Sequence, residues 1–548
     1  MVLFFYYIHL FFHFLQFFRL CLWYLALFSL SSHLLWPLCA AVVKAMDSKN
    51  SDKRNISAGN YGRVIKYLGI FGGAQGVSVL LGMLRNKAAS VLLGTVGFGL
   101  IALYSRTVQL FCDTTGLSLS LSAVRRMADV YSNEGREAVS HCVKVVRSIA
   151  LLTGLVGMVL MLLCSPLLSQ WMFEGDVACT LRLMLVSPVV LFMAVSGGEL
   201  AILRGVKQPG RIAFYTLWTA VSATAVSVPL YLAFGAAGII PSIFLVALLQ
   251  MAGALFFSTR LYAYRAKPFS RAILREGVDI VKLGAGYIYT TILVSASLWL
   301  VYQAITRIGG EDATGLFSAG YILAGMLPSI LFAAFDSDYY PRLSGIFART
   351  DERNAMVNEH IEVHLLVQVP VILCVIVLLP WLFPLLFKYE FMPALPMAQM
   401  AVFALLFHIM TYPISFMPVS KGDTLTFAAQ ETVYNLAFVS LTLLGYSNYG
   451  WPGAGVGMAL ARVIDLAVVC TIARIRYGFR LSRKAVRGFC MALFAGVVVM
   501  LSVLSPAAFP CVRYLGAVVA ALSVVISLRA LARHGNLFSS ILKRIFKK

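Results

Sequence analysis

Long hydrophobic stretches alternate with short polar segments along this chain, and the pattern predicts helices that cross a membrane. A membrane-spanning helix needs about 20 consecutive apolar residues. Stretches of this kind lie at roughly 64–93, 97–121, 143–166, 179–203, 211–233, 237–259, 283–306, 313–339, 361–387, 395–418, 424–445, 453–473, 488–505 and 511–530. The pattern therefore predicts an all-α polytopic membrane protein with about 14 transmembrane helices.

The positive charges indicate how these helices are oriented. Most of the 45 Lys and Arg residues gather in eight clusters, near 44–66, 125–147, 204–211, 260–282, 342–353, 421, 474–487 and 529–548. Basic loops stay on the cytoplasmic side of a membrane, so each gap between clusters should hold a pair of spans, out and back. Both ends of the predicted helical core are then cytoplasmic.

The overall composition excludes a soluble protein of this size. The chain is 60% hydrophobic and 12% charged, with a mean hydropathy of +0.85, which a soluble domain could not bury. The net charge of +22 would suggest nucleic acid in a soluble protein. Here it marks the cytoplasmic edge of the spans, where it is attracted to anionic lipid. We therefore expect the membrane lipid as a partner and no nucleic acid.

Cysteine and histidine residues give no case for a metal or another cofactor. The ten Cys show no C-x-x-C pair, and most lie in apolar runs as small buried side chains. His360 and His364 stand four residues apart and could chelate a metal from one helix face, but no third ligand is evident. No phosphate-binding glycine loop or nucleophile elbow is present either. We expect no cofactor and no enzymatic activity.

The first 45 residues differ from the rest of the chain. They form a hydrophobic, aromatic-rich extension whose only charge before Lys44 is Arg19, and they lack the basic start and cleavage site of a signal peptide. The polar, basic segment that begins at Met46 resembles an ordinary N-terminus. We interpret residues 1–45 as a start-site over-read. The alternative is a genuine extra span or a helical hairpin.

Two glycine motifs repeat at nearly the same spacing. Gly99 matches Gly315 at an offset of 216 residues, and Gly238 matches Gly455 at an offset of 217. The matches predict an N-terminal six-helix half at 46–260, a C-terminal six-helix half at 261–476, and two extra helices with a basic tail at 477–548. Because both halves start inside, we expect a pseudo-two-fold axis along the membrane normal and alternating access at their interface. The alternative is that short glycine patterns recur by chance.

These motifs, taken in order, resemble a known family. The segments LLGTVGFGLIALYS and IGGEDATGLFSAGYIL, YYPRLS at 339–344, and GAAGII and GAGVGMA before the sixth and twelfth spans resemble the O-antigen (Wzx-type) polysaccharide flippases. That family belongs to the multidrug/oligosaccharidyl-lipid/polysaccharide (MOP) exporter superfamily. The resemblance covers about residues 60–530.

The resemblance implies a substrate, a direction and a location. The substrate is an undecaprenyl-pyrophosphate-linked oligosaccharide, such as an O-antigen, capsule or exopolysaccharide repeat unit. It moves from the cytoplasmic to the periplasmic leaflet of a bacterial inner membrane. Candidate protein partners are the polysaccharide polymerase and assembly proteins.

Basic residues within the spans are candidates for binding the pyrophosphate. An ionisable side chain at the centre of a spanning helix costs about 2.5–3.5 kcal/mol, so it usually faces a cavity or a partner. Guanidinium groups bind phosphate oxygens in a two-pronged way. The candidates are Arg85, Lys87, Arg106, Arg307 and Arg462. As alternatives, Arg85, Lys87 and Arg307 could reach the outer interface with their long side chains, and Arg462 could pair with Asp465 three residues later.

Acidic and polar residues in the spans are candidates for ion coupling and sugar recognition. Protonatable carboxylates are the usual carriers of a coupling ion, here a proton or sodium. The acidic candidates are Asp113, Glu199, Glu431 and Asp465. Polar side chains that could contact sugar are Gln75, Tyr104, Gln109 and Gln303, although such residues also join helices to one another.

Two other functions stay open at this point. A multidrug exporter of the same superfamily would favour an acidic, aromatic cavity, whereas the candidates here include more bases than acids in the outer half. A membrane polymerase or ligase would act on the same lipid-linked sugars and would need a charged catalytic loop outside the membrane. The predicted outer links are too short and too poor in charge to build such a loop.

Overall fold

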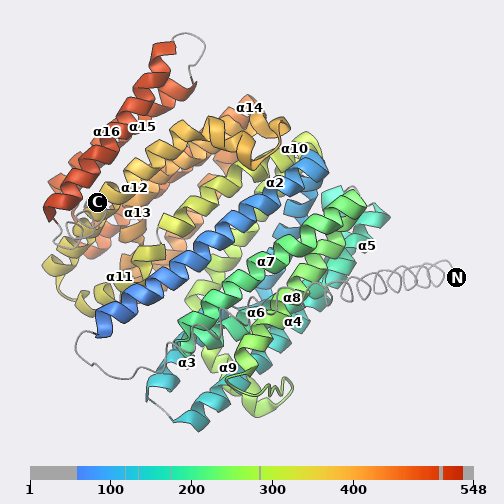
Figure 1. Cartoon of the computed structure of the whole chain (residues 1–548). Coiled ribbons are helices and arrows are strands. Elements are labelled where there is room, and N and C mark those ends of the chain that lie inside the picture. Colours follow the sequence, from blue (N-terminus) through green and yellow to red (C-terminus); the bar gives the residue numbers. More distant parts are fainter. Residues whose placement is uncertain are drawn as a thin grey trace. The chain divides into compact units, whose positions relative to one another are not determined.

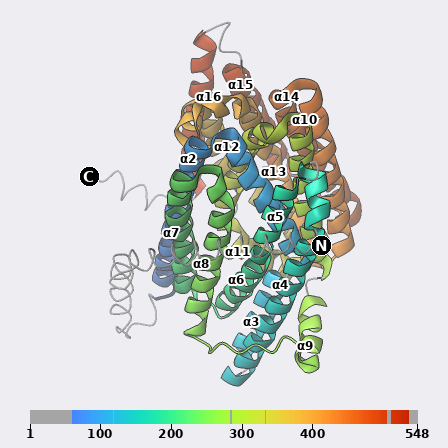
Figure 2. The same ribbon diagram turned by 90° about the vertical axis from the view of Figure 1, so that its right-hand side faces the viewer.

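The computed structural model describes residues 59–117, 119–133, 135–173, 176–282, 285–331, 333–504 and 510–534. Every regular element in these ranges is a helix (Figures 1 and 2). The helices are α2 (Gly59–Thr115), α3 (Leu119–Asn133), α4 (Arg136–Phe173), α5 (Val177–Val186), α6 (Pro188–Gly205), α7 (Pro209–Phe234), η2 (Gly235–Gly238), α8 (Ile239–Thr259), α9 (Arg271–Lys282), α10 (Ala285–Leu331), α11 (Ala333–Ile346), α12 (Thr350–Leu386), η3 (Tyr389–Ala394), α13 (Leu395–Lys421), α14 (Thr424–Tyr477), α15 (Arg483–Leu504) and α16 (Pro510–His534). The predicted all-α class is confirmed. The predicted extension at 1–45 lies outside the described residues.

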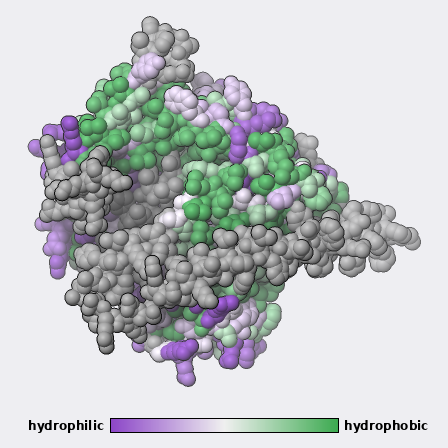
Figure 3. All heavy atoms as spheres, in the orientation of Figure 1, coloured by the Kyte–Doolittle hydropathy of each residue, from purple (hydrophilic) through white to green (hydrophobic). Residues whose placement is uncertain are grey.

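The helices coincide with the predicted spans, but several predicted pairs are joined. Within the described ranges, nine helical segments are long and apolar enough to cross a membrane. Four of these segments, Gly73–Thr115, Pro209–Thr259, Gly286–Met326 and Thr424–Tyr477, contain or overlap two predicted spans each. The number of crossings therefore stays a prediction. Large apolar side chains such as Leu163, Leu385 and Phe494 are more than half exposed, and Figure 3 shows hydrophobic residues over much of the visible helical surface. Such a surface fits contact with lipid.

Three long helices continue through sharp bends because a glycine occupies each bend. Gly94 in α2, Gly310 in α10 and Gly450 in α14 have φ values of 66°, 77° and 64°. Residues with a Cβ rarely adopt this left-handed region, whereas glycine does so at little cost. The predicted links between spans are thus reduced to a single bend in the backbone.

Positive φ angles recur along the chain at a fixed spacing. Gly94 and Gly310 are 216 residues apart, Gly235 and Gly450 are 215 apart, and Lys207 and Gly422 are also 215 apart. These offsets are close to the 216 and 217 residues that separate the repeated sequence motifs. Corresponding turns of the two predicted halves therefore use the same unusual backbone conformation.

The described residues group into two compact units. The first contains residues up to 92 together with 111–284, and the second contains 93–110 together with the chain from 285 onward. The first unit has a buried apolar core that α3, α4, α6 and α9 share, with Met127, Val146 and Ile202 fully buried. The predicted halves meet at residues 260/261, so they differ from these units mainly in the placement of residues 93–110.

Helix α13 forms the centre of the second unit. It packs against α10, α12, α14 and α15, and most of its residues are buried. The short segment 93–110 packs in the same unit, where Gly99 meets the backbone of Glu311 and Gly315 meets the backbone of Thr95. A side chain at either glycine would clash with a carbonyl oxygen, so these two repeated glycines permit close approach of the two helices.

Candidate functional site

The second unit holds a buried ion pair on α14. Arg462 Nη1 lies 3.1 Å from Asp465 Oδ2, and the two side chains are 22% and 10% exposed. They are three positions apart on the helix, so they share one face. The pairing that the sequence offered as an alternative for Arg462 is therefore present.

A second carboxylate and an aromatic ring border this ion pair. The Arg462 guanidinium carbon lies 4.0 Å from the centre of the Tyr434 ring, a cation–π geometry. Glu431 interacts electrostatically with both Arg462 and Asp465. The amide of Asn435 donates a 2.8 Å hydrogen bond to the Glu431 backbone carbonyl and lies 3.5 Å from its carboxylate.

Arg106 approaches the same group of residues from α2. Its guanidinium carbon lies 5.5 Å from the centre of the Tyr302 ring, and the charges of both Arg106 and Arg462 act on Tyr321. The neighbouring Thr107 hydroxyl accepts a 3.1 Å hydrogen bond from the Trp299 indole, which helps to fix this part of α2 against α10. We call Arg106, Glu431, Arg462 and Asp465, with Tyr302, Tyr321 and Tyr434, the charged cluster.

The charged cluster can exchange one ionic partner for another. The cluster contains two guanidinium groups and two carboxylates, so its formal charges cancel. When a proton or a metal cation neutralises the carboxylates, the guanidinium groups become free to bind an anion. From the sequence, the candidates for pyrophosphate binding and for ion coupling formed separate sets. The structure brings Arg462 of the first set together with Glu431 and Asp465 of the second set on α14.

The remaining candidates take different positions. In the second unit, Arg307 is exposed beside the bend in α10, Tyr104 is buried and Gln109 is partly buried. Gln303 is 7% exposed, and neither its amide nitrogen nor its amide oxygen has a hydrogen-bond partner. In the first unit, Glu199 is fully buried. The other candidates of that unit are partly buried: Gln75, Arg85, Lys87 and Asp113.

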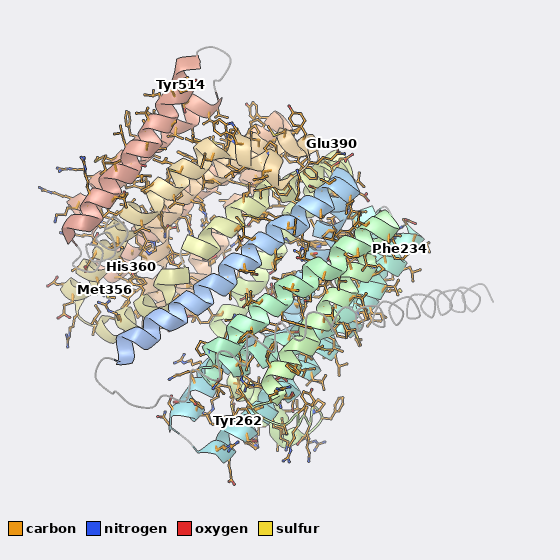
Figure 4. All side chains as sticks on the ribbon, in the orientation of Figure 1. Phe234, Tyr262, Met356, His360, Glu390 and Tyr514 are labelled. Carbon is orange, nitrogen blue, oxygen red and sulfur yellow. The ribbon has the colours of Figure 1, made fainter. Side chains whose placement is uncertain are left out.

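Glu199 is held in an ion pair that the sequence did not predict. Its two carboxylate oxygens lie 2.8 and 3.1 Å from Nε and Nη2 of Arg147, and both side chains are 1% exposed. Arg147 also donates to the Ser258 hydroxyl and to the backbone carbonyls of Tyr262 and Ala263; Figure 4 labels Tyr262. Both carboxylate oxygens of Glu199 are therefore already engaged by side chains of the protein.

This ion pair joins α4, α6 and α8 to the segment that follows α8. The Arg147 guanidinium also lies 5.0 Å from the Tyr264 ring centre. Burial, together with the Glu199 charge, raises the pKa of Tyr264. The sequence placed Arg147 in a cytoplasmic basic cluster, and no local pattern marks a partner 52 residues away.

Two histidine residues of α12 belong to a second polar group, and from the sequence this pair was considered only as a possible metal site. His360 and His364 lie with ring centres 4.7 Å apart, and Gln368 continues the same helix face. Within the described residues, no group of three His, Cys, Asp or Glu side chains is placed to hold a metal ion. The spacing of His360, His364 and Gln368 was the available signal for a polar row on one face.

Comparison with solved structures identifies the fold. The chain is similar to the lipid II flippase MurJ in an inward closed conformation, with a TM-score of 0.62, 14% identity, and coverage of 87% of this chain and 99% of that one. It is also similar to a multidrug resistance MATE family transporter of the MOP superfamily. The inward-facing form gives a TM-score of 0.58 and 13% identity, with coverage of 73% and 94%. The outward-facing form gives a TM-score of 0.54 and 15% identity, with coverage of 75% of this chain and 94% of that one.

Comparison with protein families identifies the chain more directly. No curated protein matches the sequence. A family described as polysaccharide biosynthesis protein matches residues 64–347, which is more than half of the chain. Together with the helical membrane fold, this match shows that the chain is a multi-pass membrane protein that belongs to the polysaccharide biosynthesis protein family.

Proposed function

We propose that this protein is a flippase for undecaprenyl-pyrophosphate-linked oligosaccharide, an O-antigen, capsule or exopolysaccharide repeat unit. It moves the lipid from the cytoplasmic to the periplasmic leaflet by alternating access. The observation that carries this proposal is the charged cluster, in which Arg106 and Arg462 lie partly buried beside tyrosine rings within helices that the proposal places in the membrane. Membership in the polysaccharide biosynthesis family and the fold shared with a lipid II flippase support it.

In this proposal the arginines hold the pyrophosphate and the carboxylates regulate access to them. With Glu431 and Asp465 ionised, Arg462 is paired within the protein and its affinity for phosphate is low. Neutralisation of the carboxylates by a proton or sodium releases the guanidinium for phosphate oxygens, so ion binding and substrate binding become coupled. Arg85, Lys87 and Arg307 are further predicted contributors to the pyrophosphate site, and Gln303 offers a buried amide to sugar hydroxyl groups.

The orientation of the helices follows from their basic ends. Arg474 and Arg476 occupy the last turn of α14, and Arg349 and Arg353 lie at the start of α12. Because basic residues are retained on the cytoplasmic side, we propose a bacterial inner-membrane location with both termini of the core in the cytoplasm.

A flipping assay tests the proposal. Vesicles containing the purified protein and an undecaprenyl-pyrophosphate oligosaccharide would be compared for wild type, Arg106→Ala and Arg462→Ala, with a glycan-specific enzyme reporting the accessible leaflet. We expect wild type to move the lipid and both variants to lose at least about tenfold in rate, as for loss of a charge-assisted contact. Arg126→Ala is the matched control, because Arg126 also pairs with an acid three residues away, at 3.5 Å, but is 44% exposed.

A multidrug exporter is the second candidate, and two observations favour it. The fold matches MATE transporters, and two carboxylates beside three tyrosines could also bind an organic cation. The same vesicles loaded with ethidium distinguish the two functions. Gradient-driven ethidium transport without movement of any lipid-linked sugar would replace the flippase proposal, and formation of longer glycan chains would instead indicate a polymerase.

A further inference from the structure

A row of polar side chains lies along one face of α12 in the second unit. His360, His364 and Gln368 occupy successive turns of one helix face, with His360 one turn beyond Met356 (Figure 4). His360 stacks on the Tyr339 ring at 3.9 Å between ring centres. His364 and Gln368 are fully buried, which is unusual for a row of polar residues on a helix that spans lipid.

The row continues from α12 to α13 through an aromatic ring. The Tyr412 ring centre lies 6.1 Å from that of His364 and 5.5 Å from that of His408. His364 and His408 also interact electrostatically. At about 1.5 Å per helical residue, both histidines lie about 20 Å from the basic ends of their helices, so they are at similar depth.

From α13 the row reaches the charged cluster on α14. His408 Nδ1 lies 3.3 Å from the Thr411 hydroxyl, and Thr411 is near enough to the Asp465 carboxylate to interact with it. Asp465 in turn pairs with Arg462 and interacts with Glu431. Titratable or hydroxyl-bearing groups thus succeed one another from His360 to the carboxylates that the proposed function assigns to coupling.

The side chains in the row suit proton transfer. Imidazole titrates near neutral pH and can accept a proton on one ring nitrogen while it releases another from the second. The 2.7 Å contact between Gln368 Nε2 and His364 Nδ1 fits an amide N–H donating to an unprotonated ring nitrogen. That contact leaves the His364 proton on Nε2 and fixes the orientation of the ring.

We propose that His360, His364 and His408, with Tyr412 and Thr411, form a proton path from the cytoplasmic end of the second unit to Asp465 and Glu431. This inference rests on the proposed function and names its coupling ion as the proton. In the final step protonated His408 gives its proton, through the Thr411 hydroxyl, to the Asp465 carboxylate. The products are neutral His408 and a neutral Asp465 carboxylic acid, so Arg462 loses the anion of its ion pair.

Several other charged or titratable groups surround the path and set its electrostatics. Arg462 faces His408, and Tyr339 of α11 faces His360. Helices α15 and α16 pack against α12. Among the described side chains, the charged residues of α15 are Arg483, Lys484 and Arg487, in its first two turns. In α16 the charged side chain that the structure describes is Arg529, near the end of the helix.

Proton flux can be measured without knowing the glycan. Protein would be reconstituted into liposomes that contain the pH-sensitive dye pyranine, and a potassium gradient with valinomycin would impose a membrane potential. We expect wild type to admit protons faster than protein-free liposomes. His364→Gln and His408→Gln, which keep polarity but cannot carry a proton near neutral pH, should reduce this flux at least about tenfold.

A histidine outside the row serves as the control. His141 of α4 is 53% exposed and lies 3.4 Å from Glu276, so His141→Gln should leave the flux within about twofold of wild type, as for a surface substitution. Thermal unfolding of each variant separates loss of the path from loss of the fold. Flux in folded His364→Gln and His408→Gln equal to that of wild type would overturn the proposal.

A parallel flipping measurement distinguishes failure of the path from failure of the proposed function. Lipid movement that follows a sodium gradient, with no proton flux above that of empty liposomes, would refute the path and keep the flippase. Histidine-dependent proton flux without movement of the lipid-linked sugar would keep the path and refute the flippase.

Discussion

The buried ion pair between Arg147 and Glu199 leads to a quantitative stability prediction. A guanidinium group has five N–H donors, and those of Arg147 meet the two Glu199 oxygens, the Ser258 hydroxyl and the carbonyls of Tyr262 and Ala263. Glu199→Gln keeps the size of the side chain but removes its charge. It also turns one acceptor into an N–H donor that faces the guanidinium.

The magnitude follows from what the substitution removes. Two charge-assisted hydrogen bonds, worth about 1.5–3 kcal/mol each, are weakened or lost. The Arg147 charge is left inside a site where its side chain is 1% exposed, and breaking a buried ion pair costs about 3–5 kcal/mol. We therefore expect Glu199→Gln to lower the free energy of unfolding by about 3–5 kcal/mol.

The assay is an equilibrium unfolding titration of purified protein in mixed micelles. Glu352→Gln is the control, because Glu352 pairs with Arg349 at 3.1 Å but is 56% exposed, and a surface pair contributes about 0–1 kcal/mol. The double variant Arg147→Met with Glu199→Met should be less destabilised than Glu199→Gln, since no charge is left unpaired. If Glu199→Gln lowered the free energy of unfolding by no more than the Glu352→Gln control, the reasoning would be refuted.

Three further substitutions test close packing, pH dependence and backbone strain. Gly315→Ala places a methyl group against a carbonyl oxygen and should lower stability by about 1–3 kcal/mol in thermal unfolding; Gly325→Ala, with open space around it, should not. Burial alone would raise the pKa of Asp423, but hydrogen bonds, first from Tyr477, and a neighbouring arginine lower that pKa below its usual value. Its stabilisation is therefore complete above the unfolded pKa of about 3.9 and is lost as pH falls through the folded pKa. Asp423→Asn should flatten stability in that acid range, and an unchanged acid slope would contradict this assignment. Gly422→Ala forces a side chain into a backbone with φ of 78°. The substitution should destabilise the protein by about 1–2 kcal/mol and so lower its melting temperature. An unchanged melting temperature would show that the backbone at this bend relaxes.

Local patterns in the sequence predicted most of the helices. Apolar length predicted helices that could cross a membrane, and the three-residue spacing of Arg462 and Asp465 already indicated their pairing, because these signals depend on neighbouring residues. The bends at Gly94 and Gly310 lie within the links that glycine motifs marked. What the sequence lacked was the joining of spans into continuous helices, because a hydropathy pattern does not specify backbone angles.

Contacts between distant helices were the part that could not be predicted. Arg147 looked like one cytoplasmic base among many, since its partner Glu199 lies 52 residues later. His408 stood alone in an apolar run, and only packing of α12 on α13 brings it near His364. Because an unpaired charge is costly to bury, a buried arginine is expected to have a partner. Which residue becomes that partner depends on the packing of the helices.

The glycine bends also determine where the chain can be cut or extended. At Gly94, Gly310 and Gly450 one helix passes into the next with no loop between them, so proteases find little flexible backbone there. An inserted epitope tag would have to break a helix at those positions. The link between α8 and α9 has no helix at residues 264–270, beyond the two carbonyls that Arg147 holds, and its exposed part around Phe269 offers a better site for insertion or cleavage. In sealed vesicles, a protease should therefore cut more readily on the face of the membrane that exposes the link between α8 and α9 than on the face that exposes the glycine bends.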